Sequence, residues 1–195
     1  ASAALALVAP AAAQDFAIAN ATVATGDGSE PVENATVVVR DGRIVEAGTG
    51  VSAPGGVEVI DGRGKWVTPG IFSAVTTLGL ADVDAVSESN DTAARNSPFS
   101  AALNVAPAIN PASQQLLVAR ADGITRASIT PQPASGIFGG QGAVIDLGAD
   151  ADPITRARAF QIVALGEAGA RLAGGSRTGT YAWLDNALHE AQAYA

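Results

Sequence analysis

This 195-residue sequence has no cysteine and no methionine, and lysine and histidine occur once each, as Lys65 and His189. Without cysteine the chain forms no disulfide and offers neither a thiolate nucleophile nor a cysteine-ligated zinc site. A lone histidine on an outward-facing position cannot anchor a Ser-His-Asp triad. Because the sequence does not begin with methionine, we expect it to be a piece of a longer chain.

Positive charge is also scarce, with 11 basic residues against 19 acidic ones and a net charge of −8. Negative charge repels phosphate backbones and anionic lipid, so we expect no nucleic acid partner and no membrane contact beyond an export signal. The 22 glycines, 10 prolines and 5% aromatic residues predict many turns and short elements rather than a helical bundle. The alanine-rich, arginine-over-lysine composition is typical of a GC-rich bacterial genome.

The first 13 residues, ASAALALVAPAAA, form an apolar run that ends in small side chains. Ala11 and Ala13 fit the A-x-A pattern that signal peptidase requires, and the run is shorter than the ~20 apolar residues of a membrane span. We interpret residues 1–13 as the remnant of an export signal, cleaved before Gln14, which predicts a periplasmic or secreted protein. The alternative is a buried alanine-rich helix, although Pro10 interrupts it.

Short β-strands are predicted over residues 14–66. Residues 16–23, 36–40, 43–47 and 57–60 are strand-length apolar or β-branched runs. Asp41-Gly42 separates two of them and predicts a hairpin, because a type I′ turn needs positive φ at both central residues. This spacing of short strands and turns predicts a small β-sandwich segment.

The pattern changes after residue 66. Residues 71–80 form a nearly continuous apolar run, which favours a strand covered on both faces as in a parallel sheet or barrel. Residues 82–115 are polar and predict a long excursion, after which residues 124–130 and 143–147 predict two further strands. Residues 155–172 predict a helix, weakened by two glycines, and residues 181–195 an amphipathic helix.

Three other features of the sequence are candidate sites. His189 follows Asp185 by four residues, which suggests either an oriented base or a solvated helix pair that contributes ~0.3 kcal/mol, and we favour the pair. The glycine-rich stretch 136–142 is followed by a strand pattern and lacks Gly-Lys-Ser/Thr, so we interpret it as a turn rather than a phosphate loop. Four acidic residues, Asp82, Asp84, Glu88 and Asp91, lack EF-hand spacing and predict a solvated loop.

Four sequence motifs follow one another along the chain. They are V-V-V-R-D-G-R-I-V-E-A-G (37–48), V-I-D-G-R-G (59–64), V-T-P-G-I-F (67–72) and G-I-T-R-A-S-I-T-P (123–131), of which the last is the loosest match to a family pattern. Over residues 16–147 the chain thereby resembles the N-terminal portion of the amidohydrolase superfamily, in its imidazolonepropionase-like branch. The resemblance implies an α/β fold: a composite β-sandwich segment over 14–66, then the first part of a TIM-type (β/α)8 barrel over 67–195, incomplete here.

The resemblance fails at the metal motif. The family phrase continues as Asp-x-His-x-His, whereas this sequence has Ser73-Ala-Val75-Thr-Thr77, so Val75 and Thr77 occupy the two histidine positions. Alternation along the strand puts both side chains on one face, where imidazoles would bind zinc or another divalent metal. Valine has no lone pair and a threonine hydroxyl is a poor zinc ligand, so no metal ligand and no cofactor is predicted from this stretch. Lys65 precedes the barrel and cannot replace the family's bridging lysine, which comes from a later strand.

Three functions remain open. By resemblance, the full-length protein is an exported hydrolase of carbon–nitrogen bonds in amide, lactam or small peptide-like substrates, with metal ligands from later strands. Alternatively, it is a catalytically inactive relative that serves as a binding module or as partner subunit of an active amidohydrolase paralogue. A metal-independent enzyme of another class is the third possibility. In each case we expect this stretch alone to be inactive.

Overall fold

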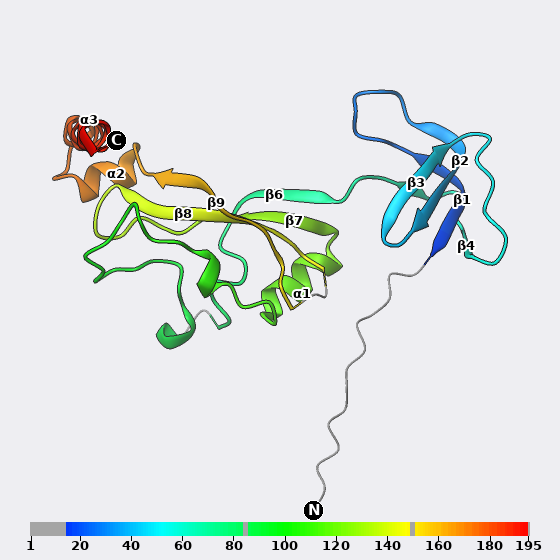
Figure 1. Ribbon diagram of the computed structural model, residues 1–195, viewed down its shortest axis with the longest axis horizontal. Coiled ribbons are helices and arrows are strands. Elements are labelled where there is room, and N and C mark those ends of the chain that lie inside the picture. The colour runs from blue at the N-terminus through cyan, green and yellow to red at the C-terminus, as the bar shows by residue number, and fades with distance from the viewer. Residues whose placement is uncertain (1–14, 84–85, 149–150, 195) are drawn as a thin grey trace, which may run out of the picture. The chain divides into compact units, whose positions relative to one another are not determined.

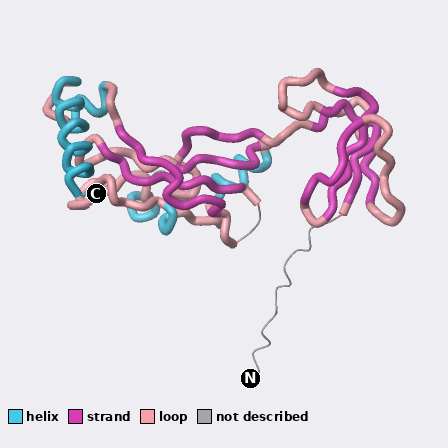
Figure 2. The backbone as a smooth tube through the Cα atoms, turned by 45° about the horizontal axis from the view of Figure 1, so that its top comes forward, coloured by secondary structure: helices cyan, strands magenta, loops and turns pink. Residues whose placement is uncertain are grey.

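The computed structural model describes residues 15–83, 86–148 and 151–194. The chain divides into two compact units, Ala1–Pro69 and Gly70–Ala195, each built on one mixed β-sheet (Figures 1 and 2). The fold is therefore α/β with two mixed sheets. The predicted export signal, with Ala11 and Ala13, lies outside the described residues.

The first unit is a five-stranded sheet centred on β1 (Phe16–Val23). β1 pairs antiparallel with β2 (Val32–Arg40), which pairs antiparallel with β3 (Arg43–Gly48). Its other edge pairs in parallel with β4 (Glu58–Asp61) and then with β5 (Trp66–Val67). The predicted strands of this region are confirmed, and the described strands form one sheet.

The turn between β2 and β3 has the geometry that its residues predict. Asp41 and Gly42 both have positive φ, 48° and 70°. A type I′ turn requires this at both central positions, and its twist matches that of the flanking strands. The predicted hairpin is therefore confirmed.

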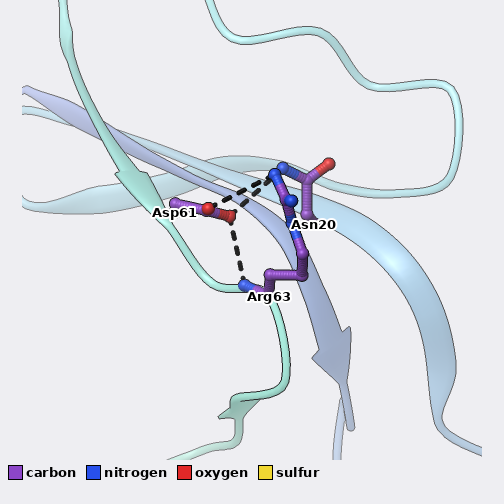
Figure 3. A network of polar contacts seen from close by, with 3 residues as sticks. All are labelled: Asn20, Asp61 and Arg63. Atoms are coloured by element: carbon purple, nitrogen blue, oxygen red, sulfur yellow. Dashed lines mark hydrogen bonds and ion pairs between the residues drawn. The ribbon is translucent and has the colours of Figure 1, made fainter.

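A bulge in β1 is fixed by polar contacts to the end of β4. Asn20 lies where the β1–β2 register shifts, with φ of 60°. Its Nδ2 donates to Asp61 Oδ1 at 3.3 Å, while the Arg63 amide donates to the same oxygen at 3.2 Å (Figure 3). The Arg63 guanidinium lies 3.4 Å from Asp61 Oδ2. The Asn20 hydrogen bond, followed by that from the Arg63 amide, lowers the pKa of Asp61.

The second unit begins with a β–α–β arrangement. β6 (Ile71–Thr76) pairs in parallel with β7 (Ile124–Ile129). A long excursion and then helix α1 (Gln114–Ala121) connect the two strands. The excursion contains two short helices, η1 (Ser87–Ser89) and η2 (Ala106–Ala108). α1 ends at Ala121, and Gly123 follows its C-cap Asp122 with a positive φ of 89°, which suits the residue after a helix cap. β8 (Phe138–Asp146) and β9 (Ile154–Val163) then add antiparallel strands in the order β6-β7-β8-β9.

One core holds the second unit together. α1 and the excursion lie on one side of the sheet (Figure 1). Their buried side chains pack against those of β7 and β8. The largest fully buried members are Leu80, Ile129 and Ile145. The excursion is therefore part of the packed structure, although it is irregular as predicted.

Three predictions for this unit are wrong. Residues 155–172 are not one helix: they contain most of β9 and then the short helix α2 (Glu167–Leu172). The strand predicted at 143–147 begins earlier, at Phe138, so most of the glycine-rich stretch 136–142 is strand and not turn. The run 71–80 ends as a strand at Thr76. It is not covered on both faces, because Ile71, Phe72 and Val75 are exposed.

The helix predicted near the C-terminus is confirmed. Helix α3 (Arg177–Tyr194) contains residues 181–194 of the predicted helix and packs against α2, while Ala195 lies outside the described residues. Only β6 and β7 are parallel among the described strands of this sheet, whereas β8 and β9 are antiparallel. The incomplete TIM-type barrel therefore stays a prediction.

Candidate functional site

A pocket of about 440 Å³ lies where β6 and β7 end. Parallel strands that end together create the crevice in which α/β proteins bind ligands. Val75 and Thr77, the two positions singled out in the sequence, both line this pocket. The full lining is Val75, Thr76, Thr77, Thr130, Pro131, Gln132, Pro133 and Ile162.

Backbone hydrogen bonds hold the two strand ends together. The carbonyl oxygen of Thr76 accepts from the Thr130 amide at 2.8 Å and from the Thr130 hydroxyl at 3.1 Å. The amide of Leu78 donates to the Thr76 hydroxyl at 3.2 Å, which turns the chain directly after β6. Thr76 and Thr130 are thus fixed side by side in the pocket wall.

The excursion after β6 returns to these strand ends. The Gln132 amide donates to the Thr92 carbonyl at 2.7 Å, and the Asp91 amide donates to the Leu80 carbonyl at 2.7 Å. Farther on, the Gln141 amide donates to the Leu103 carbonyl at 2.6 Å, so this segment takes the place beside β8 where β7 has ended. The polar excursion therefore borders the pocket region and is held there by backbone contacts.

Ile162 enters the pocket from β9 because the backbone of β8 approaches closely at a glycine. A Cβ on Gly139 would lie 2.7 Å from the Pro131 carbonyl oxygen and 3.1 Å from Ile162. Such contacts are too short for any side chain, so the position requires glycine. The glycine-rich stretch thus positions the β8–β9 hairpin against the pocket.

The donors at this pocket do not fit the metal that the resemblance implies. Zinc takes thiolate, imidazole or carboxylate ligands, and the eight lining residues of the described chain include none of these. Across residues 15–83, 86–148 and 151–194, no group of three or more His, Asp or Glu side chains is arranged to hold a metal ion. The three threonines of the lining offer only neutral hydroxyl oxygens.

The acidic residues of the excursion lie elsewhere. Asp82 accepts from Asn110 Nδ2 at 3.0 Å and lines a separate pocket of about 410 Å³ beside α1. Glu88 is exposed, and hydrogen bonds from its own amide and from the Ser87 hydroxyl lower its pKa. Asp91 borders a third, smaller pocket of about 190 Å³, and Asp84 lies outside the described residues.

His189 is far along the chain from these strands and is solvent-exposed on α3. Its Nδ1 lies 3.5 Å from Asp185 Oδ2 and 2.9 Å from the Asp185 carbonyl oxygen. Their side chains are 69% and 73% exposed, respectively. The arrangement is the solvated helix pair that we favoured.

Sequence reasoning singled out Val75 and Thr77 and missed the other lining residues, among them Thr130, Gln132 and Ile162. Thr130 and Gln132 could have been found, because they lie at and just beyond the end of a predicted strand, residues 124–130. Ile162 could not, because its segment was predicted to be helical. No described helix is long and apolar enough to span a membrane.

Comparison with known proteins gives a partial sequence match and a broader fold match. No protein-family model matches the sequence. Imidazolonepropionase from Methylobacterium nodulans is 42% identical over 65 residues, which is 30% of this chain and 16% of that protein. The chain therefore spans a small part of that relative.

The fold match is with a solved amidohydrolase from Thermotoga maritima. It covers 92% of this chain and 48% of that one, with a TM-score of 0.79 and 24% sequence identity. At this identity the match concerns the fold, and this chain spans about half of that protein. Both comparisons support the resemblance drawn from the sequence phrases.

Proposed function

From its resemblance to the N-terminal portion of the amidohydrolase superfamily, in the imidazolonepropionase-like branch, we propose that this chain is part of an exported hydrolase of carbon–nitrogen bonds. The observation that carries the proposal is the pocket at the ends of β6 and β7, where Val75 and Thr77 lie together. The substrates of the proposed hydrolase are amides, lactams or small peptide-like molecules. In this proposal the described chain supplies a wall of the site, and metal ligands come from other parts of the full-length protein.

A second function is supported by the chemistry of the same wall. Valine and threonine stand where the family has histidines, and the lining residues offer no zinc ligand. This favours a catalytically inactive relative that binds a ligand or serves as partner subunit of an active amidohydrolase paralogue. The two functions differ in two measurable properties, the metal content of the whole protein and its hydrolysis of amides.

The deciding experiment uses full-length protein purified without chelators from a periplasmic extract. Elemental analysis should find fewer than two tightly bound transition-metal ions per chain, because a two-metal site draws several of its ligands from the first strand. N-terminal sequencing should find Gln14, or a neighbouring residue, as the first residue. Two zinc equivalents would contradict the degenerate site. Hydrolysis of an amide panel would support the first function, and a metal-free protein without activity would support the second.

A paired variant tests whether the rest of a metal site survives. Val75→His with Thr77→His should add up to one tightly bound zinc per chain if other ligands are in place. The matched control is Val45→His with Ala47→His, two exposed positions with the same spacing on β3. A gain of zinc in both pairs would show adventitious binding rather than a restored site.

A further inference from the structure

The pocket of about 410 Å³ beside α1 is a groove that follows the helix from one end to the other. Its lining includes Leu78, Asp82, Gln114, Val118, Asp122 and Ile124, and this surface is called the α1 groove below. None of its lining residues belongs to the pocket at the ends of β6 and β7. Its volume is typical of sites that bind small molecules.

The α1 groove has a carboxylate group at each end. Asp82 lies near the start of α1, because both of its carboxylate oxygens accept from Asn110 Nδ2 at 3.0 Å and Asn110 comes shortly before the helix. Asp122 is the C-cap residue at the other end of the helix. The eight residues of α1 between them span about 12 Å. The two carboxylates are therefore too far apart to bind one metal ion together.

No basic side chain of the described chain neutralises these carboxylates. The ion pairs found among the described residues involve neither Asp82 nor Asp122. Arg120 lies in the last turn of α1, but its guanidinium donates to the Leu147 carbonyl at 3.0 Å. The C-terminus of the helix adds a partial negative charge beside Asp122. Asp82 keeps lone pairs for a donor besides Asn110, so both ends of the groove favour a positive charge.

The surface between the two ends is apolar. Val118 and Ala119 line the middle of the groove, and Leu78 and Ile124 add apolar side chains from the chain after β6 and from the start of β7. Val118 is 54% exposed, so a ligand can still cover much of its side chain. A methylene group that is buried on such a surface strengthens binding by up to about fourfold. The middle of the groove therefore suits a hydrocarbon chain.

We propose that the α1 groove binds a linear aliphatic diamine in its dicationic form. One ammonium group pairs with Asp82 and the other with Asp122, while the methylene chain lies on Val118. A monocation leaves one carboxylate unpaired, and an anion is repelled at both ends. The inference does not rest on the proposed hydrolase, because it concerns other residues and requires no reaction.

Four probes of similar length separate the effect of charge from that of the chain. Octamethylenediamine has an ammonium group at both ends and octylamine at one end. In ω-aminooctanoate a carboxylate replaces the second ammonium group, and octanedioate has a carboxylate at both ends. Binding to the full-length protein is measured by titration calorimetry. Methyl NMR of Leu78, Val118 and Ile124 shows whether the probe lies in the groove.

The diamine should bind more tightly than the other three probes. We expect its affinity to be about two- to fivefold that of octylamine, the effect of one exposed ion pair. The affinity should be lower for ω-aminooctanoate and lowest for octanedioate, because each carboxylate of the probe meets a carboxylate of the protein. The advantage of the diamine over octylamine should disappear at about 1 M salt, where charges are screened over a few ångströms.

Two variants test the carboxylates one at a time. Asp82→Asn and Asp122→Asn should each weaken diamine binding by about two- to fivefold and remove its advantage over octylamine. The matched control is Asp91→Asn, which removes the same charge from an exposed position of the excursion outside the groove. It should leave the order of the four affinities unchanged.

A second pair of variants tests the apolar surface. Val118→Lys places an ammonium group in the middle of the groove and should weaken diamine binding by about tenfold or more, because it repels the ligand and removes apolar contact. Leu117→Lys is the matched control, since Leu117 is exposed on the same helix but does not line the groove. This variant should bind the diamine several times more tightly than Val118→Lys does.

Several results would overturn the inference. These are equal affinity for the diamine and octanedioate, an advantage over octylamine that persists in high salt, or an equal loss in Asp91→Asn and Asp122→Asn. Methyl shifts confined to residues outside the groove would also refute it. So would a folded full-length protein that binds no diamine, because the groove is then filled by another part of that protein. A protein that hydrolyses amides but binds no diamine would refute this inference alone.

Discussion

The two sheets of this chain bury different kinds of side chains and depend on different forces. The first sheet buries alanines and valines, among them Ala17, Ala21 and Val37, while the second buries Leu80, Ile129 and Ile145. Among the described residues, three of the four non-glycine residues with positive φ lie in the first unit, at Asn20, Asn34 and Asp41. Where core side chains are small, turns and bulges must specify the strand register. The comparison teaches that the first sheet relies on backbone geometry and the second on packing.

The largest effect expected from this comparison is a cavity in the second sheet. Ile129 is fully buried on β7, so Ile129→Ala in the full-length protein should destabilise that unit by about 2–5 kcal/mol. Val37→Ala in the first sheet removes fewer atoms and should cost about 2 kcal/mol. Hydrogen exchange of amides in β7 and β1 separates the two effects. An equal loss at both positions would remove the distinction between the sheets.

The first unit was largely predictable because its signals are local. Asp41-Gly42 between two β-branched runs specifies a hairpin through the φ values that the turn demands. The short strands at 16–23 and 57–60 follow from alternation and from the turns that end them. What the sequence could not predict is the order of the sheet, in which β1 pairs with β2 on one side and with β4 and β5 on the other.

The second expected effect is strain at this turn. Gly42 has φ of 70°, a conformation that a β-branched residue adopts only at a cost, so Gly42→Val should destabilise the first unit by about 1–2 kcal/mol. Gly55→Val is the matched control, because Gly55 has no positive φ and nothing lies within 4 Å of an added Cβ. Thermal unfolding of the two variants should differ accordingly, and identical midpoints would show that the turn does not limit stability.

The second unit was less predictable because its strands depend on distant partners. Residues 154–163 are rich in helix-forming side chains, yet they form β9 because β8 offers a long antiparallel partner, with a register shift near Arg158. β8 was predicted only in part, because its glycines are untypical of a strand. They allow close backbone approach at Gly139 and Gly140. The candidate site is predictable to the same extent. Val75 and Thr77 could be identified from a local sequence motif, whereas Ile162 reaches the pocket only through the pairing of β8 with β9.

The smallest expected effect concerns acid and the loop between β1 and β2. Hydrogen bonds from Ser29, followed by one from the Thr25 hydroxyl, lower the pKa of Asp27 from 3.8 to about 2. Because the folded pKa lies below the ordinary value, the ionised carboxylate stabilises the loop above about pH 4. That contribution is lost as the pH falls toward 2.

Carboxyl NMR should find Asp27 titrating near 2, and Thr25→Val should raise its pKa toward 3.8. If local polar contacts specify the first unit, the Ser29 amide should exchange faster at pH 2 than at pH 5, relative to a core amide such as that of Ile129. A wild-type titration at 3.8 would show that the loop is not held by this carboxylate.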